Sequence, residues 1–163
     1  MKLKLLFLIV LIVTPLNIWA QKNKLVGYRH KGVVYGALLP NGAKDLGGGL
    51  LSDEGYGVTR FLKDGALMLW LEKLASRDKE GVPSWEVRDV LVIGKLKKNQ
   101  EILLSYSSGC LQKGRENLDL IVLAQIVPKS KIYKVLRSWN ANTMRERFDK
   151  TSIKKIKCTV TES

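Results

Sequence analysis

The chain has 163 residues, of which 45% are hydrophobic and 26% are charged, and its formal net charge is +13 at pH 7. A chain of this length can bury the core of one domain without the help of a metal. It contains one histidine, two cysteines and no internal repeat or low-complexity tract, so the composition gives no support to a metal site, a cofactor or a repeat architecture.

The first 20 residues, MKLKLLFLIVLIVTPLNIWA, have the layout of a secretory signal peptide. Lys2 and Lys4 precede an unbroken apolar run, and Ala20 is a small residue at the expected cleavage site. Spanning a membrane takes about 20 apolar residues, so an uncleaved anchor is the less favoured alternative. We expect an exported protein, periplasmic or secreted, that keeps no transmembrane segment after cleavage.

Two parts are expected after the signal peptide: a flexible segment over residues 21–35 and a single β-rich domain over residues 36–163. The domain opens with a glycine-rich stretch. Within it, Asn41-Gly42 predicts a tight hairpin turn. The three glycines that begin at Gly47 predict a bend or bulge in a strand rather than a phosphate-binding loop, because the pattern G-x-x-x-x-G-K-S/T is absent.

Residues 66–76 are the first of two ambiguous stretches. Leu67, Trp70, Leu71 and Leu74 match helical spacing. A polar turn and the strand-like SWEVRDVLVIG follow, however, and these are typical of the second arm of a hairpin. We therefore predict two paired strands here, with a helix over residues 66–76 as the alternative.

The second half of the chain continues the strand pattern. LDLIVLAQIVP is apolar on both faces, which predicts a central strand. Residues 130–147 are the second ambiguous stretch, for which we favour a hairpin over a short helix. Near the end, Ile156, Cys158 and Val160 alternate with polar residues and predict a half-buried strand. The whole pattern predicts a mainly β fold, a single antiparallel β-sandwich or small barrel, with one short helix as an alternative.

The two cysteines are Cys110 and Cys158. In an oxidising compartment an even number of cysteines suggests one disulfide bond, and two free thiols are the alternative. A bond that closes a loop of this length would contribute about 4 kcal/mol. A catalytic cysteine is disfavoured because the single histidine, His30, lies near the start of the mature chain, where we expect it to be exposed and flexible rather than a ligand.

Asp89 interrupts an otherwise apolar strand face. With period two, that face also carries Trp85, Val87, Leu91 and Ile93. A carboxylate in such a layer must be paired, hydrogen-bonded or protonated, because isolated burial of its charge is costly. We expect Asp89 to be a buried anchor held by an arginine or by the backbone. A register slip and a functional acid are the alternatives.

The final quarter of the chain is strongly basic. From Pro128 onward, ten lysines and arginines are opposed by three acidic residues, which gives this quarter a charge of +7. Three aromatic residues are interleaved and suit a surface for anions or sugars, while a solvated face over an aromatic core is the alternative. The candidate surface consists of Lys134, Arg137, Trp139, Arg145, Arg147, Lys155 and Lys157.

Seven segments together resemble a group of small exported proteins of cyanobacterial type that lack an assigned activity. The segments occur in the order ALLPNG, GGGLLSDEGYGVTRF, MLWLE, WEVRDVL, SGC, RSWNANTMRERF and IKC. The resemblance covers residues 36–158. It implies an exported, mostly β protein in which Cys110 pairs with Cys158, and it implies no site residues.

These features favour a non-enzymatic envelope protein that binds an anionic lipid or polysaccharide through its basic surface. Nucleic acid is disfavoured as a partner because an exported protein meets little of it. The alternatives are a glycan hydrolase that uses Asp89 with a nearby glutamate, and a small inhibitor of a secreted enzyme. Enzymatic activity is disfavoured because the motif G-x-S-x-G is absent and His30 is the sole histidine base.

Overall fold

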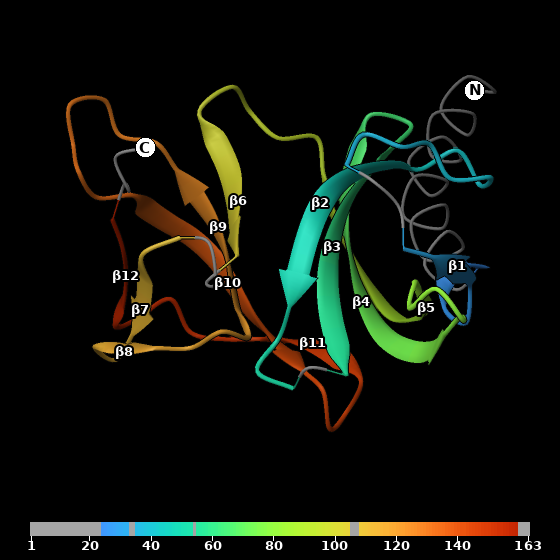
Figure 1. The fold of residues 1–163 in the computed structure, drawn as a ribbon. Coiled ribbons are helices and arrows are strands. Elements are labelled where there is room, and N and C mark those ends of the chain that lie inside the picture. Colours follow the sequence, from blue (N-terminus) through green and yellow to red (C-terminus); the bar gives the residue numbers. More distant parts are fainter. Residues whose placement is uncertain (1–23, 33–34, 54, 105–107, 160–163) are drawn as a thin grey trace, which may run out of the picture.

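The computed structural model describes residues 24–32, 35–53, 55–104 and 108–159 (Figure 1). The expected signal peptide over residues 1–20 lies outside these ranges. Within them the fold is mainly β, as predicted, and helical conformation is confined to Lys24 and Leu25. Within the same ranges no helix has the length and apolar character needed to cross a membrane.

The first sheet has five antiparallel strands in the order β1-β5-β4-β3-β2. Its strands are β1 (Arg29–Lys31), β2 (Lys44–Leu50), β3 (Tyr56–Lys63), β4 (Ala66–Arg77) and β5 (Pro83–Gly94). The pairing of β4 with β5 confirms the hairpin predicted for residues 66–76. Residues 67–72 are buried without a break. Both faces of β4 are therefore covered, which explains why its sequence also fits a helix.

The second sheet has four antiparallel strands in the order β11-β10-β9-β6. Its strands are β6 (Gln100–Leu104), β9 (Leu120–Gln125), β10 (Lys134–Asn142) and β11 (Arg147–Lys150). The β10–β11 hairpin confirms that the stretch 130–147 forms strands. As expected, β9 is a central strand, and its first five residues are buried.

The third sheet is small and lies at the other side of the second sheet from the first (Figure 1). Its strands, in the order β12-β7-β8, are β7 (Cys110–Gln112), β8 (Arg115–Glu116) and β12 (Ile156–Cys158). The predicted half-buried strand at the end of the chain is β12, in which Ile156 and Cys158 are buried and Lys157 is exposed.

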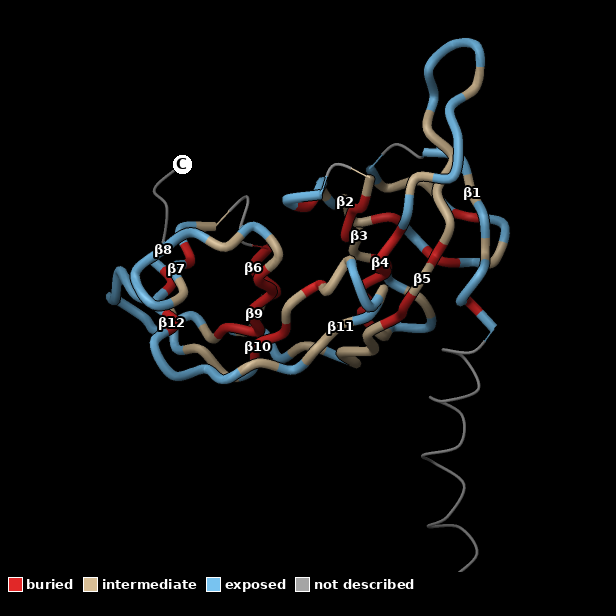
Figure 2. Tube along the Cα trace, turned by 90° about the horizontal axis from the view of Figure 1, so that it is seen from below, coloured by how far each residue is buried: buried red, intermediate tan, exposed pale blue. Residues whose placement is uncertain are grey.

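Buried side chains form one core between each pair of neighbouring sheets and a further core on the far face of the first sheet. The central core lies between the first and second sheets and includes Leu69, Ile121 and Trp139. Between the second and third sheets, Val122 and Cys158 belong to a smaller core. In Figure 2 the buried residues are concentrated in β6, β9 and the middle of the first sheet. The curled antiparallel sheets form a half-barrel, which is consistent with the predicted β-sandwich or small barrel.

The far face of the first sheet carries an outer core that includes Phe61, Met68 and Trp70. Leu25 and Leu39, from segments that precede the long strands, cover this face. Residues 24–32 therefore belong to the folded body, although they fall inside the segment expected to be flexible.

A bulge in β2 lies where the backbone of β2 approaches the backbone of β3 closely. The register with β3 shifts between Asp45 and Gly48, as the glycine run predicts. A Cβ atom on Gly48 would lie 2.3 Å from the carbonyl oxygen of Val58, so only glycine fits. Gly47 has a φ of +78°, a left-handed value that glycine adopts without strain.

Candidate functional site

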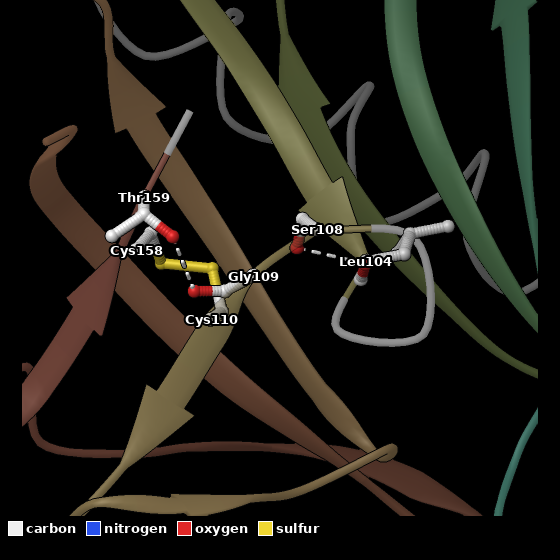
Figure 3. Close-up of a disulfide and its surroundings, with 6 residues drawn as sticks. All are labelled: Leu104, Ser108, Gly109, Cys110, Cys158 and Thr159. Atoms are coloured by element: carbon white, nitrogen blue, oxygen red, sulfur yellow. Dashed lines mark hydrogen bonds between the residues drawn. A yellow bond between two sulfur atoms is a disulfide. The ribbon is translucent and has the colours of Figure 1, made fainter. Parts of the chain in front are cut away.

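A disulfide bond joins β7 to β12 and fixes the third sheet (Figure 3). Cys110 and Cys158 stand directly opposite each other in the register and are both buried. Next to the bond, the Thr159 hydroxyl donates a hydrogen bond to the carbonyl oxygen of Gly109 over 3.3 Å. The last strand is thus attached covalently to the middle of the chain, which confirms the predicted pairing.

The disulfide also sets the position of three lysines. The register places Lys157 opposite Leu111, and the backbone N–H of Lys113 donates to the carbonyl oxygen of Lys155 over 2.7 Å. These residues and Gly114 line a cavity of about 330 Å³, which we call the lysine pocket. One apolar residue and three lysines therefore line the cavity.

The charge of the lysine pocket is not neutralised within the described part of the chain. No described carboxylate lines the pocket or lies within ion-pair distance of Lys113, Lys155 or Lys157. Glu116 lies opposite Leu111 on β8, but its exposed side chain is not part of the lining. Three neighbouring cations without a partner repel one another, so an incoming anion would relieve this repulsion.

The backbone of the lysine pocket is strained at two of its lysines. Lys113 has a φ of 54° and Lys155 a φ of 65°, in the left-handed region that non-glycine residues avoid. Such a conformation costs on the order of 1 kcal/mol per residue. At Lys113 it belongs to the two-residue hairpin turn between β7 and β8, in which Gly114 also has a positive φ. Here it orients two turns so that both lysines border the same cavity.

The structure does not assemble the predicted basic surface as a whole. It brings Lys155 and Lys157 together at the lysine pocket. Arg145 and Arg147 instead flank Asp149 in the β10–β11 hairpin, at 3.7 and 2.7 Å from its carboxylate. In both views of the whole fold β11 lies well away from β12 (Figures 1 and 2).

Two further members of that predicted surface lie on β10 as exposed side chains, Lys134 and Arg137. Trp139 requires a correction. Its side chain belongs to the central core and only 8% of the residue is exposed, so it contributes to packing and not to an exposed surface. The interior face of β10 takes the aromatic ring because the first sheet covers that face.

Glu146 connects the second sheet to the first. It lies in the turn between β10 and β11, and its carboxylate accepts hydrogen bonds from Tyr56 at 2.7 Å, Lys73 at 3.0 Å and the Nε of Arg88 at 2.7 Å. The Tyr56 hydroxyl contributes most to lowering the pKa of Glu146 from 4.5 to about 2, and Lys73 and Arg88 act in the same direction against the effect of burial. Lys73 and Arg88 are thus ion-paired with Glu146, whereas no described carboxylate pairs with the lysines of the lysine pocket.

Replacing Glu146 with glutamine should reduce the loss of unfolding free energy that the original protein shows as the pH falls. The pKa of Glu146 is lower in the folded chain than in the unfolded chain. The contribution of Glu146 to the free energy of unfolding is therefore complete above pH 4.5 and is lost as the pH falls towards about 2. We expect Glu146→Gln to cost about 2 kcal/mol at neutral pH, after allowance for its partial exposure. Urea denaturation at a series of pH values measures this. Parallel curves for the two proteins would contradict the assignment.

His30 and Glu72 form a buried pair that the sequence analysis missed. The Nε2 atom of His30 lies 2.6 Å from Glu72, and the two side chains are 6% and 3% exposed. Thr59 donates its hydroxyl hydrogen to the other carboxylate oxygen over 2.7 Å. The expectation that His30 is exposed and flexible is therefore wrong, because β1 pairs with β5 and directs the imidazole into the outer core.

Both ring nitrogens of His30 face acceptors, since its Nδ1 lies 2.9 Å from the carbonyl oxygen of Lys31. Burial lowers the pKa of His30, but the hydrogen bond and the negative charge of Glu72 outweigh burial, and the net pKa is raised above 6.5. The ring also packs between Phe61 and Trp70, at centroid distances of 6.1 and 6.0 Å. The geometry is that of an imidazolium stabilised by a carboxylate and aromatic rings.

Asp89 lies on the face of β5 that points towards the second sheet. It is 6% exposed, and its carboxylate accepts a hydrogen bond of 2.8 Å from the backbone N–H of Phe148 on β11. An edge strand such as β11 presents N–H groups that its own sheet does not pair. Asp89 satisfies one of them and so links the two sheets, which accounts for a carboxylate on an apolar face.

Comparisons of the chain with known protein families, with curated proteins and with solved structures gave no match. Among the described residues, no cluster of three or more His, Cys, Asp and Glu side chains could hold a metal ion. Lysine ammonium groups, which the lining of the lysine pocket offers, form charge-assisted hydrogen bonds with phosphate and carboxylate groups. Of its lysines, the sequence analysis missed Lys113, because the turn that contains it gives no periodic signal.

Proposed function

We propose that this protein is exported and binds an anionic component of the cell envelope through the lysine pocket, without catalysing a reaction. The observation that carries the proposal is the cluster of Lys113, Lys155 and Lys157 around one cavity with no described carboxylate partner. The disulfide between Cys110 and Cys158 is compatible with an oxidising compartment outside the cytosol.

The ligand groups that fit this pocket are the phosphates of envelope lipids or the carboxylates of an acidic polysaccharide. Each lysine near an anionic surface contributes about 1 kcal/mol of attraction. Leu111 adds an apolar contact beside the ammonium groups, which suits a headgroup next to a chain or a sugar ring. Nucleic acid stays disfavoured because export removes the protein from it.

The geometry supports binding better than glycan hydrolysis. A glycosidase needs two carboxyl groups that both reach the substrate in a cleft. Asp89 is buried and uses its carboxylate to accept the N–H of Phe148. Glu72, on the neighbouring strand, faces the outer core with His30. Asp89 and Glu72 therefore point to opposite faces of the first sheet.

Reversing two charges at the lysine pocket tests the proposal. The variant Lys155→Glu/Lys157→Glu should bind anionic phosphatidylglycerol vesicles at least about tenfold more weakly than the original chain. The matched control is Lys97→Glu/Lys98→Glu, which changes the same charge at two exposed lysines outside the pocket. Parallel titrations with neutral vesicles and with an acidic polysaccharide distinguish the two ligand sources.

The dependence of vesicle binding on salt concentration is a second test of the proposal. Binding should fall steeply from low to moderate salt, because the contacts lie at the surface and are screened. Equal weakening in both charge-reversal variants would show only a general charge effect and would count against a specific pocket. Binding that salt leaves unchanged would also overturn the proposal.

A further inference from the structure

A second cavity, of about 450 Å³, lies at the end of the molecule where the chain passes from the first sheet to the second. Gly65, in the β3–β4 turn, and Gly94, at the end of β5, border it on one side. Ile102, near the start of β6, borders it on the other side. Figure 1 shows the connection that crosses between the sheets before β6. The cavity thus opens between two sheets whose facing sides form the central core.

The larger part of the wall of this cavity is apolar. Leu67 and Ile102 belong to the central core and are 7% and 6% exposed. Leu46 and Leu96 pack against that core. Leu62 also lines the cavity and is 37% exposed. The volume falls in the lower part of the range for small-molecule sites, roughly 300–1,000 Å³, and suits one alkyl chain.

Two cations lie on the lining of the same cavity. Arg60 is half-buried, and its guanidinium donates to the carbonyl oxygens of Leu46 at 3.0 Å and Gly47 at 3.3 Å. No described carboxylate lies within ion-pair distance of Arg60. Lys95, exposed directly after β5, is the second cation.

Glu101 is the single acidic residue of this lining. It precedes Ile102 on β6, and alternation along the strand places its side chain on the opposite face from Ile102. There it interacts with the hydroxyl of Tyr133, whose ring packs against the core of the third sheet. The charge that faces the cavity is therefore positive.

An apolar wall with cations and no facing acid complements a single-chain amphiphile with an anionic head. We propose that this cavity binds a medium-chain fatty acid, with the alkyl chain between the two sheets and the carboxylate near Arg60 and Lys95. The proposal does not depend on the lysine pocket, because that pocket lies on the third sheet. Arg60 is pre-positioned by its two backbone hydrogen bonds, so little side-chain freedom is lost when the carboxylate binds.

Calorimetric titration of the purified protein with dodecanoate, below its micelle concentration, tests the proposal. We expect one molecule to bind per chain. Leu62→Glu places a negative charge at the mouth and should weaken binding by about tenfold or more. Leu118→Glu is the matched control, since Leu118 is 38% exposed and lies outside both cavities. Lys155→Glu/Lys157→Glu should leave dodecanoate binding unchanged, which separates this site from the proposed envelope function.

Changing the ligand head on the unaltered protein avoids any question of folding. Dodecanoate should bind about tenfold more tightly than dodecyltrimethylammonium, because only the anionic head matches the cations. Arg60→Gln should weaken dodecanoate binding and leave dodecanol binding unchanged. Absence of dodecanoate binding, equal affinity for the cationic amphiphile, or a Leu62→Glu variant that binds like the original chain would each overturn the proposal.

Discussion

Replacing Cys110 and Cys158 with serine is expected to lower the free energy of unfolding by about 4 kcal/mol. The two residues are separated by 48 positions, so the bond removes a large amount of conformational freedom from the unfolded chain. Urea denaturation of the original and the double-serine protein gives the difference directly.

Chemical reduction of the disulfide bond in the original protein is a control for the double substitution. Reducing the original protein with dithiothreitol should lower its stability by the same amount as the double substitution. The third sheet should also loosen first, because β12 pairs with only three residues of β7. Anion binding at the lysine pocket should therefore weaken in the double-serine protein while the fold persists. A change in unfolding free energy below about 1 kcal/mol would contradict a structural role for the bond.

Replacing His30 with leucine is expected to cost about 3–5 kcal/mol at neutral pH, because it leaves the buried carboxylate of Glu72 without its cation. Thr59 alone then hydrogen-bonds that carboxylate among the described residues. The double variant His30→Leu/Glu72→Leu should be more stable than His30→Leu, since it removes the uncompensated charge. Chemical denaturation of the single and double variants gives the coupling energy.

The pH dependence of stability tests the same pair. The pKa of His30 is raised in the folded chain, against the lowering effect of burial, chiefly by its hydrogen bond to Glu72. The contribution of His30 to the free energy of unfolding is therefore complete below pH 6.5. It is lost as the pH rises through the raised pKa that His30 has in the folded chain. His30→Gln should lack this alkaline loss. A His30→Gln protein whose stability falls over the same pH range as the original would contradict the assignment.

The strands could be predicted where alternation is clear or where apolar runs are bounded by turns. SWEVRDVLVIG became β5, and IKC near the chain end became β12. The glycine run became a bulge in β2 because a Cβ on Gly48 would collide with β3. These features depend on local spacing and backbone sterics, which a sequence displays directly.

Features that depend on long-range register could not be predicted in the same way. Glu72 shares a face with Met68 and Trp70, so an acid among apolar neighbours was a signal that could have been found. Its partner His30 lies 42 residues away on a three-residue strand that carries no pattern of its own. The position of Trp139 in the core likewise depends on how the second sheet packs on the first. Side-chain partners across sheets follow from topology, which composition and periodicity leave open.

The lysine pocket is tested most directly by a heteronuclear NMR titration of the oxidised protein with short-chain phosphatidylglycerol. If the account is right, the largest changes in amide shifts occur at Lys113, Gly114, Lys155 and Lys157, and they vanish in the Lys155→Glu/Lys157→Glu protein. No shifts at these residues, or changes centred instead on the arginines of the β10–β11 hairpin, would contradict it.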